Sequence, residues 1–183
     1  MSISVELLDC LGSNKTVANA ARVSFAVHTD EFRDKDKRLL RYLAKNNHWA
    51  PYAHVQLSLR LKAPLFVARQ LVKHQVSLCW SEVSRRYVDF TPEFYAPEAW
   101  RKRAPDKKQG SLDETFEGRQ EQRFDEKYWD LMTRCETVYN NMISSGVAPE
   151  QARMVLPQSM MTEWYWTGSL VAFARVVTQR ISE

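Results

Sequence analysis

The sequence predicts a mixed α/β domain in which helices outnumber strands. The clearest strand signal is residues 55–62, where Val and Leu alternate with polar residues and so share one face. The clearest helix signal is residues 113–144, which open with the acidic pair Asp113–Glu114 that favours a helix N-terminus. The order strand, helix, strand, helix and then mostly helices is typical of such a domain. We expect a single domain over residues 1–183, because this length supports one core and is too short for two full domains.

The other elements of the first half follow from local patterns. Residues 3–8 alternate enough to predict a first strand. Ala and Val at helical spacing predict a helix over 14–26, and a charged face beside a leucine side predicts another over 34–46. Pro64 suits the first turn of a helix, where its missing N–H is not needed. We therefore expect a helix over residues 64–75.

The second half is expected to be helical after a long surface segment. Residues 76–82 are interpreted as a short connection, and residues 91–111 hold three prolines and a dense basic patch that predict a surface excursion. Gly146 is expected to end the long helix, and Pro149 is expected to open a short one. Residues 162–180 are expected to form the last helix.

The charge and cysteine content narrow the function classes. Lys and Arg number 26 against 22 Asp and Glu, a net charge of +4, which suits anionic small ligands, whereas a polynucleotide binder usually has a denser basic stripe. Cys10, Cys79 and Cys135 are an odd number at wide spacing and indicate neither a disulfide framework nor a metal site. Reduced thiols, the absence of a signal-peptide pattern and an uncharged stretch at 164–174 that is too short for a bilayer lead us to expect a soluble cytoplasmic protein.

The densest polar cluster lies between residues 69 and 87. On the predicted helix Arg69 shares a face with Lys73, and Gln70 shares one with His74. A solvated helical face is the alternative for each of them alone. The polar run that follows supplies guanidinium and hydroxyl donors for a phosphate and comprises Ser81, Glu82, Ser84, Arg85 and Arg86. Together the two runs indicate an anion site, with an ordinary helical ion pair between Glu82 and Arg86 as the alternative.

This cluster resembles the signature of flavin-dependent thymidylate synthases, the ThyX family. That signature reads Arg-His-Arg followed by Glu-x-Ser-x-Arg-Tyr, and this chain reads Lys73-His74-Gln75 and then Glu82-Val83-Ser84-Arg85-Arg86-Tyr87. Residues 62–70 before the triplet are also typical of the family, and a second block agrees at 152–157 and 162–170. The resemblance implies a ThyX-like fold, a small antiparallel sheet flanked by long helices.

The chain also departs from the family pattern. Lys73 and Gln75 replace two arginines, one residue is inserted after the triplet, and Cys79 and Ser81 stand where the family has Ser and Asn. Lys keeps a charge without the planar fork, and Gln keeps donors without charge, so we expect altered flavin contacts. Family members continue into a further helix, so the resemblance implies that this C-terminal helix is missing from residues 1–183.

The resemblance implies a transferase that makes dTMP from dUMP by reductive methylation, with methylenetetrahydrofolate, FAD and NADPH. The implied dUMP-binding residues are Gln70, Lys73, Glu82, Val83, Ser84, Arg85, Arg86, Arg153 and Arg180. The implied FAD-binding residues are His54, His74, Gln75, Ser169 and Arg175. Arg180 is also the implied catalytic residue, because it matches an arginine that favours ionisation of the pyrimidine ring. The family's homotetramers share active sites between subunits, so the implied partner is a second copy of the chain.

Simpler interpretations remain for several of these residues. Arg153 and Arg175 could be solvated helix arginines, Ser169 a small packing residue and His54 a strand-edge histidine. The aromatic run at 164–166 is expected to belong to the core. Cys79 could be a nucleophile, but packing is the favoured interpretation.

Two functional alternatives also remain. The altered triplet allows flavin-dependent hydroxymethylation of a deoxypyrimidine nucleotide. The basic residues at 101–103 and 107–108 allow a non-catalytic nucleotide- or nucleic-acid-binding relative.

Overall fold

The computed structural model describes residues 2–106 and 110–181. They form two compact units. The sheet unit comprises residues 3–62, 68–82 and 163–181, and the long-helix unit comprises Ser2 and residues 63–67, 83–106 and 110–162. The expected elements are present, although several differ in extent or in type.

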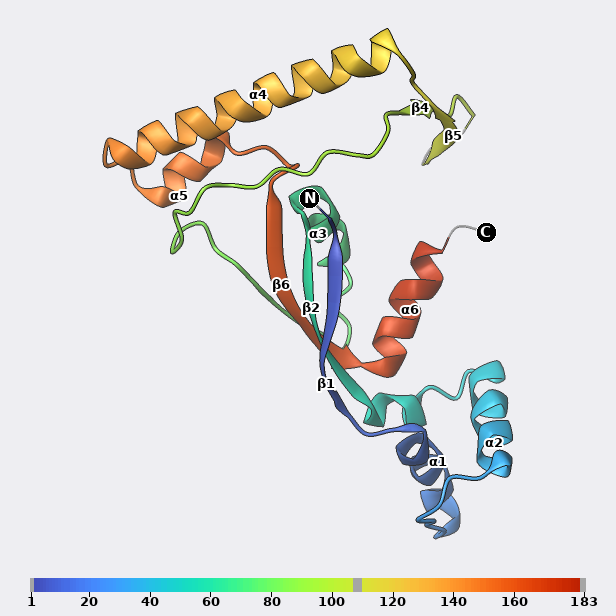
Figure 1. Ribbon diagram of the computed structural model, residues 1–183. Coiled ribbons are helices and arrows are strands. Elements are labelled where there is room, and N and C mark those ends of the chain that lie inside the picture. The colour runs from blue at the N-terminus through green and yellow to red at the C-terminus, as the bar shows by residue number, and fades with distance from the viewer. Residues whose placement is uncertain (1, 107–109, 182–183) are drawn as a thin grey trace. The chain divides into compact units, whose positions relative to one another are not determined.

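The sheet has four strands in the order β1-β2-β6-β3, and Figure 1 shows β1, β2 and β6. Their bounds are β1 Ser4–Leu11, β2 Gln56–Pro64, β3 Leu78–Glu82 and β6 Met161–Ser169. β1 pairs antiparallel with β2, and β3 pairs antiparallel with β6. Between the central strands Ser58 contacts Thr167 at 3.1 Å and Arg60 contacts Glu163 at 2.7 Å, so β2 and β6 also run in opposite directions. The expected mixed fold with a small antiparallel sheet is confirmed.

Two helices of the sheet unit begin at a serine residue that takes part in capping. Their bounds are α1 Asn14–Arg22, η1 Val23–Phe25, α2 Asp34–Lys45, η2 Ala50–His54 and α6 Leu170–Arg180, and α3 Leu65–Leu71 contributes its last four residues. The backbone N–H of Ser13 donates to Thr16 at the start of α1. Ser169 caps α6 by accepting a hydrogen bond from the Ala172 N–H at 3.3 Å. α1 and α6 both contact η2, which ties the helices to the entry of β2.

The core of the sheet unit is built around β6. Trp164 is 1% and Trp166 4% exposed, whereas Tyr165 between them is 52% exposed, which is the period-two pattern of a strand. Trp166 packs edge-to-face on Phe173 of α6 at 5.2 Å. The expectation that this aromatic run lies in the core is thus confirmed for its two tryptophans.

A buried ion pair joins α1 to the start of α2. The Asp36 carboxylate accepts hydrogen bonds from the Arg33 backbone N–H at 2.7 Å and from the guanidinium of Arg22. Asp36 is 1% exposed. The Arg33 N–H, followed by the Arg22 guanidinium, holds the pKa of the Asp36 carboxyl below its ordinary value of 3.8.

This pair makes the stability of the protein depend on pH. A carboxyl whose pKa is lowered by folding stabilises the fold above its unfolded pKa, and this contribution is lost as the pH falls through the folded pKa. We expect Asp36→Asn to lower the melting temperature at pH 7, with the difference from wild type narrowing below pH 3.8. Thermal melts across pH test this, with Asp34→Asn, an exposed carboxylate of the same helix, as the control. A constant difference down to pH 2 would contradict the prediction.

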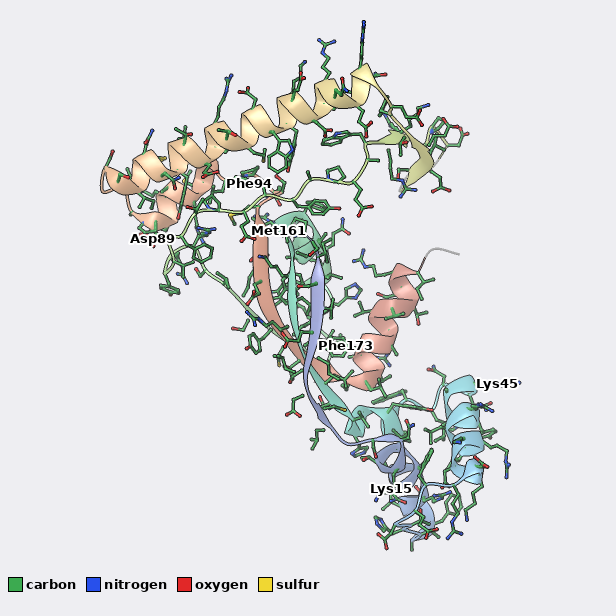
Figure 2. The ribbon with its side chains drawn as sticks, in the orientation of Figure 1. Lys15, Lys45, Asp89, Phe94, Met161 and Phe173 are labelled. Carbon is green, nitrogen blue, oxygen red and sulfur yellow. The ribbon has the colours of Figure 1, made fainter. Side chains whose placement is uncertain are left out.

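The long-helix unit packs around a small apolar cluster. Its elements are β4 Arg101–Arg103, β5 Ser111–Thr115, α4 Arg119–Ser144, α5 Pro149–Ala152 and η3 Arg153–Val155. Phe94, Met132 and Met160 form the buried cluster. The Met161 N–H donates to the Glu93 carbonyl at 2.7 Å, and Figure 2 shows Phe94 and Met161 where these segments meet.

The predicted helix over 64–75 is wrong at both ends. β2 continues through Pro64, which is buried, and α3 ends at Leu71. The chain must then reverse to enter β3, and Ser77 adopts a left-handed φ of 60° in the turn. Residues 78–82 are therefore not a connection but an edge strand, because their backbone pairs with β6.

Two other helix boundaries are also wrong. Asp113–Glu114 lies in β5 and not at a helix start, because Asp113 pairs with Arg101 at 2.6 Å across the β4–β5 hairpin. The helix of this region, α4, begins at Arg119 after Gly118. The first half of 162–180 is the strand β6, since its side chains alternate between core and solvent.

The expected chain breaks at Gly146 and Pro149 are confirmed. Gly146 has a φ of 82°, and its N–H caps α4 at the Ile143 carbonyl. Pro149 is the first residue of α5. Over residues 2–106 and 110–181, the structure has no helix with the length and apolar character needed to cross a bilayer.

Candidate functional site

Three residues expected at the site meet at the end of α6. The Arg180 Nε donates to His74 Nε2 at 3.2 Å, and its Nη2 donates to the Gln70 carbonyl at 3.2 Å. Its Nη1 lies 3.4 Å from Gln70 Oε1. In this contact the His74 Nε2 is the acceptor and the arginine N–H is the donor. The result is a guanidinium held in a fixed orientation at the surface of the sheet unit.

This arrangement does not use the predicted helix face. His74 lies beyond the end of α3, in the turn whose backbone is fixed by the His74 N–H bonded to the Leu71 carbonyl at 3.0 Å. Lys73 and Gln75 flank it in the same turn and are exposed. The interpretation of Lys73 and His74 as helix-face partners of Arg69 and Gln70 is therefore wrong, although Gln70 and His74 do meet through Arg180.

Glu82 closes the strand that follows this turn. It is exposed at the end of β3 and accepts a hydrogen bond from the Trp80 indole Nε1 at 3.1 Å. The alternative of a helical Glu82–Arg86 pair is wrong, because Glu82 lies in a strand and residues 85–87 form a turn.

The sheet unit also contains a cleft of about 360 Å³ between α2, η2 and α6. Its walls are apolar and aromatic with one cation, and its lining comprises Leu43, Ala44, Asn47, His48, Trp49, Tyr52, Leu170, Val171, Ala174, Arg175 and Thr178. The Arg175 guanidinium lies 5.8 Å from the centre of the Trp49 ring. An apolar wall, a flat ring and a guanidinium fit an aromatic ligand that carries phosphate.

The other residues expected to bind FAD lie outside this lining. His54 ends η2 and is exposed. Ser169 is 4% exposed and uses its hydroxyl as the cap of α6, which supports the simpler interpretation of this residue as structural. Sequence reasoning missed Trp49, and the only signal in the sequence is a large aromatic residue in a polar stretch.

In the long-helix unit, the half-buried Ser84 and the exposed Arg86 form a small polar group. The Ser84 hydroxyl accepts from both the backbone N–H and the Nε of Arg86, each at 3.3 Å. The Arg86 guanidinium lies 4.9 Å from the Tyr87 ring. Val83 is 42% exposed beside them, and Arg153 is exposed at the start of η3.

Arg85 differs from its neighbours because it faces the interior. Its side chain is 6% exposed, and its guanidinium lies 4.3 Å from the Phe90 ring and 5.7 Å from that of the fully buried Tyr139. It donates to the Phe90 carbonyl. The Arg85 guanidinium thus closes the loop from 85 to 90, the segment that the resemblance assigns to nucleotide binding.

Two further observations bear on interpretations made from the sequence. Cys79 is exposed on β3, so packing inside this chain does not account for it. Arg101 and Lys102 of the basic segment pair with Asp113 and Glu114, which neutralises part of the charge that suggested nucleic acid. Lys107 and Lys108 lie outside the described residues.

Comparison with known proteins identifies close resemblances along the whole described chain. The model of the family described as thymidylate synthase complementing protein (Thy1) matches residues 6–183. The flavin-dependent thymidylate synthase of Thermus thermophilus is 38% identical over 170 residues, which cover 91% of this chain and 59% of that protein. The chain thus spans about three fifths of the length of that relative.

The alignment covers a larger share of some other relatives. The flavin-dependent thymidylate synthase of Thermosipho africanus is 36% identical over 169 residues, which cover 89% of this chain and 70% of that protein. Among solved structures, a UMP/dUMP methylase, PolB from Streptomyces cacaoi bound with 5-Br dUMP, superposes with a TM-score of 0.85 at 30% identity. That alignment covers 100% of this chain and 80% of the methylase chain.

Proposed function

Because this chain belongs to the thymidylate synthase complementing protein (Thy1) family, we propose that it is a flavin-dependent methyltransferase that converts dUMP to dTMP. Relatives at 36–38% identity carry the name flavin-dependent thymidylate synthase, and a similar solved structure is a UMP/dUMP methylase with a bromo-dUMP bound. These names support a pyrimidine nucleotide as the substrate and a flavin as the cofactor.

The observation that carries the proposal is the fixed guanidinium of Arg180. Its contacts with His74 and Gln70 orient the charge before a substrate arrives, so that little reorganisation is needed during reaction. A cation placed at the edge of a uracil ring stabilises negative charge that develops on the ring. Arg180 is therefore our proposed catalytic residue, and His74 and Gln70 hold it.

The nucleotide phosphate needs cationic and hydroxyl donors. Ser84 and Arg86 offer both within one short turn, and Lys73 and Arg153 are further exposed cations. We propose Ser84 and Arg86 as phosphate contacts, and Lys73 and Arg153 as further nucleotide contacts. Glu82 is an acceptor and is assigned to a ring N–H or a ribose hydroxyl of the nucleotide.

The cleft of the sheet unit fits part of a flavin dinucleotide. Trp49 and Arg175 provide a stacking surface and a phosphate partner, and the proposed additional contacts are His54, His74 and Gln75. When bound, FAD supplies the reducing equivalents, with NADPH as the reductant and methylenetetrahydrofolate as the one-carbon donor. The protein's part is to orient the rings and to exclude water.

Assembly of several chains is part of this proposal. β1 is an edge strand of the sheet, and its apolar side chains Val5, Leu7 and Leu11 are each at least 60% exposed. A protein usually covers such an edge. A homotetramer with shared active sites provides that cover, and light scattering at micromolar concentration tests it. A monomer under these conditions would contradict this part of the proposal.

The decisive experiment is a product analysis. The FAD-loaded protein is incubated without oxygen with NADPH, methylenetetrahydrofolate and dUMP, and the nucleotide mass is measured. We expect dTMP, one methylene heavier than dUMP. A hydroxymethylated product from dUMP or dCMP would replace the proposal by the alternative reaction.

Two measurements distinguish the proposed enzyme from a relative that binds nucleotides or nucleic acid without catalysing a reaction. A purified protein that absorbs at about 450 nm, as oxidised flavoproteins do, supports the proposal that the protein is a flavin enzyme. DNA affinity that falls steeply with salt and no bound flavin would support the binding module instead. The pairing of Arg101 and Lys102 with acidic residues favours the enzyme.

A further inference from the structure

Trp80 of β3 packs against two tryptophans of the neighbouring strand, β6. Its ring stacks on that of Trp164 with centres 4.5 Å apart and planes 18° apart. It also meets the ring of Trp166 edge-to-face at 5.7 Å. Trp164 and Trp166 are almost fully buried, and backbone pairing fixes them opposite Glu82 and Trp80. The indole of Trp80 therefore has one orientation, set by the core of the sheet.

In this orientation the indole N–H is directed at Glu82. Residues 80 and 82 are two apart in a strand and so share a face. The distance from Trp80 Nε1 to Glu82 Oε2 is 3.1 Å. An indole nitrogen only donates and a carboxylate only accepts, so the direction of the bond is unambiguous. An exposed carboxylate at the end of an edge strand is thus tied to the buried core.

Trp164 shows that stacking and hydrogen bonding can be separated in this cluster. Its indole Nε1 is buried and has no hydrogen-bond partner among the described residues. Replacing Trp164 by Phe therefore removes ring area from the same stack without removing a hydrogen bond. This offers a matched control for the same change at Trp80.

We infer that Trp80 is a positioning residue that holds the Glu82 carboxylate ready to accept a hydrogen bond from a donor group of the pyrimidine nucleotide. The inference rests on the proposed function, because it gives Glu82 a nucleotide to bind. A carboxylate on a flexible side chain loses rotamer freedom when it binds, and the indole bond reduces that loss in advance. Trp80 acts through Glu82 and does not itself contact the substrate.

The test is the affinity of the protein for dUMP, measured by calorimetry on the FAD-loaded protein without turnover. Trp80→Phe keeps a ring in the stack and removes the N–H. We expect it to weaken dUMP binding by roughly tenfold, as for a lost charge-assisted hydrogen bond. In steady-state assays KM should rise by a similar factor while kcat stays within about twofold. Trp164→Phe should lower the melting temperature and leave dUMP binding unchanged.

A double-mutant cycle tests whether Trp80 affects dUMP affinity through Glu82. In a Glu82→Gln background, Trp80→Phe should change dUMP affinity by less than about twofold, because the acceptor carboxylate is already gone. Trp80→Leu, whose side chain has no hydrogen-bond donor, serves as the second variant if Trp80→Phe folds poorly.

Equal affinities of wild type and Trp80→Phe, or equal weakening by Trp80→Phe and Trp164→Phe, would overturn the inference and leave the proposed function standing. A wild-type protein that binds no dUMP at millimolar concentration would overturn both.

Discussion

Replacing Arg180 by Lys is expected to lower the rate of dTMP formation by roughly 100-fold, as removal of one preorganised donor to a developing charge does in other enzymes. Lysine keeps the positive charge but has no planar fork. It cannot donate to His74 and to the Gln70 carbonyl at the same time in the present geometry. The ammonium would therefore sample several positions, and its charge would no longer be fixed toward the substrate. Single-turnover rates with FAD, NADPH, methylenetetrahydrofolate and dUMP measure the effect.

Gln179→Ala, at an exposed neighbouring position of α6, is the control and should retain full activity. The melting temperature of Arg180→Lys should stay close to that of wild type, because all its partners are at the surface. Retention of more than half of the wild-type rate would remove Arg180 from the catalytic role. Loss of activity in both variants would instead indicate that the end of α6 is needed as a whole.

Gly168→Ala is expected to cause a large loss of stability, because β6 has no room for a side chain at this position. A Cβ at this position of β6 would lie 2.2 Å from the Ser77 carbonyl oxygen and 2.6 Å from a methyl of Leu78. The carbonyl belongs to the backbone of the turn before β3, so it cannot rotate away. We expect a loss of about 3 kcal/mol or more, seen as a fall in melting temperature of roughly 6–12 °C.

The matched control is Cys79→Ala, an exposed position on the strand paired with β6. It should change the melting temperature little and should also retain nucleotide-dependent oxidation of the flavin. If Gly168→Ala melted within a degree of wild type, β3 and its turn would have to be free to move away from β6. Loss of flavin oxidation in the folded Cys79→Ala variant would give the thiol a chemical role.

The parts of the fold that could be predicted from sequence are those set by local chemistry. The alternation at 55–62 marks a strand, Gly146 supplies a left-handed cap, and Pro149 starts a helix. Each of these signals depends on a few neighbouring residues. They hold because no distant partner competes with them.

The errors arise where distant pairing decides. Residues 162–169 are a strand because their alternate tryptophans fill the core beside β3, and residues 111–115 are a strand because their carboxylates meet Arg101 and Lys102. Neither partner is visible in a short window of sequence. The same limit applies to the candidate site, since the burial of Arg85 depends on Tyr139, more than fifty positions away along the chain.

The candidate site was predictable mainly through family resemblance. Resemblance placed Gln70, His74 and Arg180 in one site, and the structure brings these three together. Resemblance could not identify Trp80 or Trp49, because neither belongs to the family signature. Both become visible only when side-chain contacts are considered.

The stacked indoles of Trp80 and Trp164 provide a spectroscopic signal for the pairing of β3 with β6. The ring centres lie 4.5 Å apart, close enough for the electronic transitions of the two indoles to couple, and coupled transitions that are not parallel produce a positive and a negative band in circular dichroism. These bands report whether β3, at the edge of the sheet, is paired with β6. Spectra recorded during titration or heating would therefore follow that edge separately from the rest of the molecule.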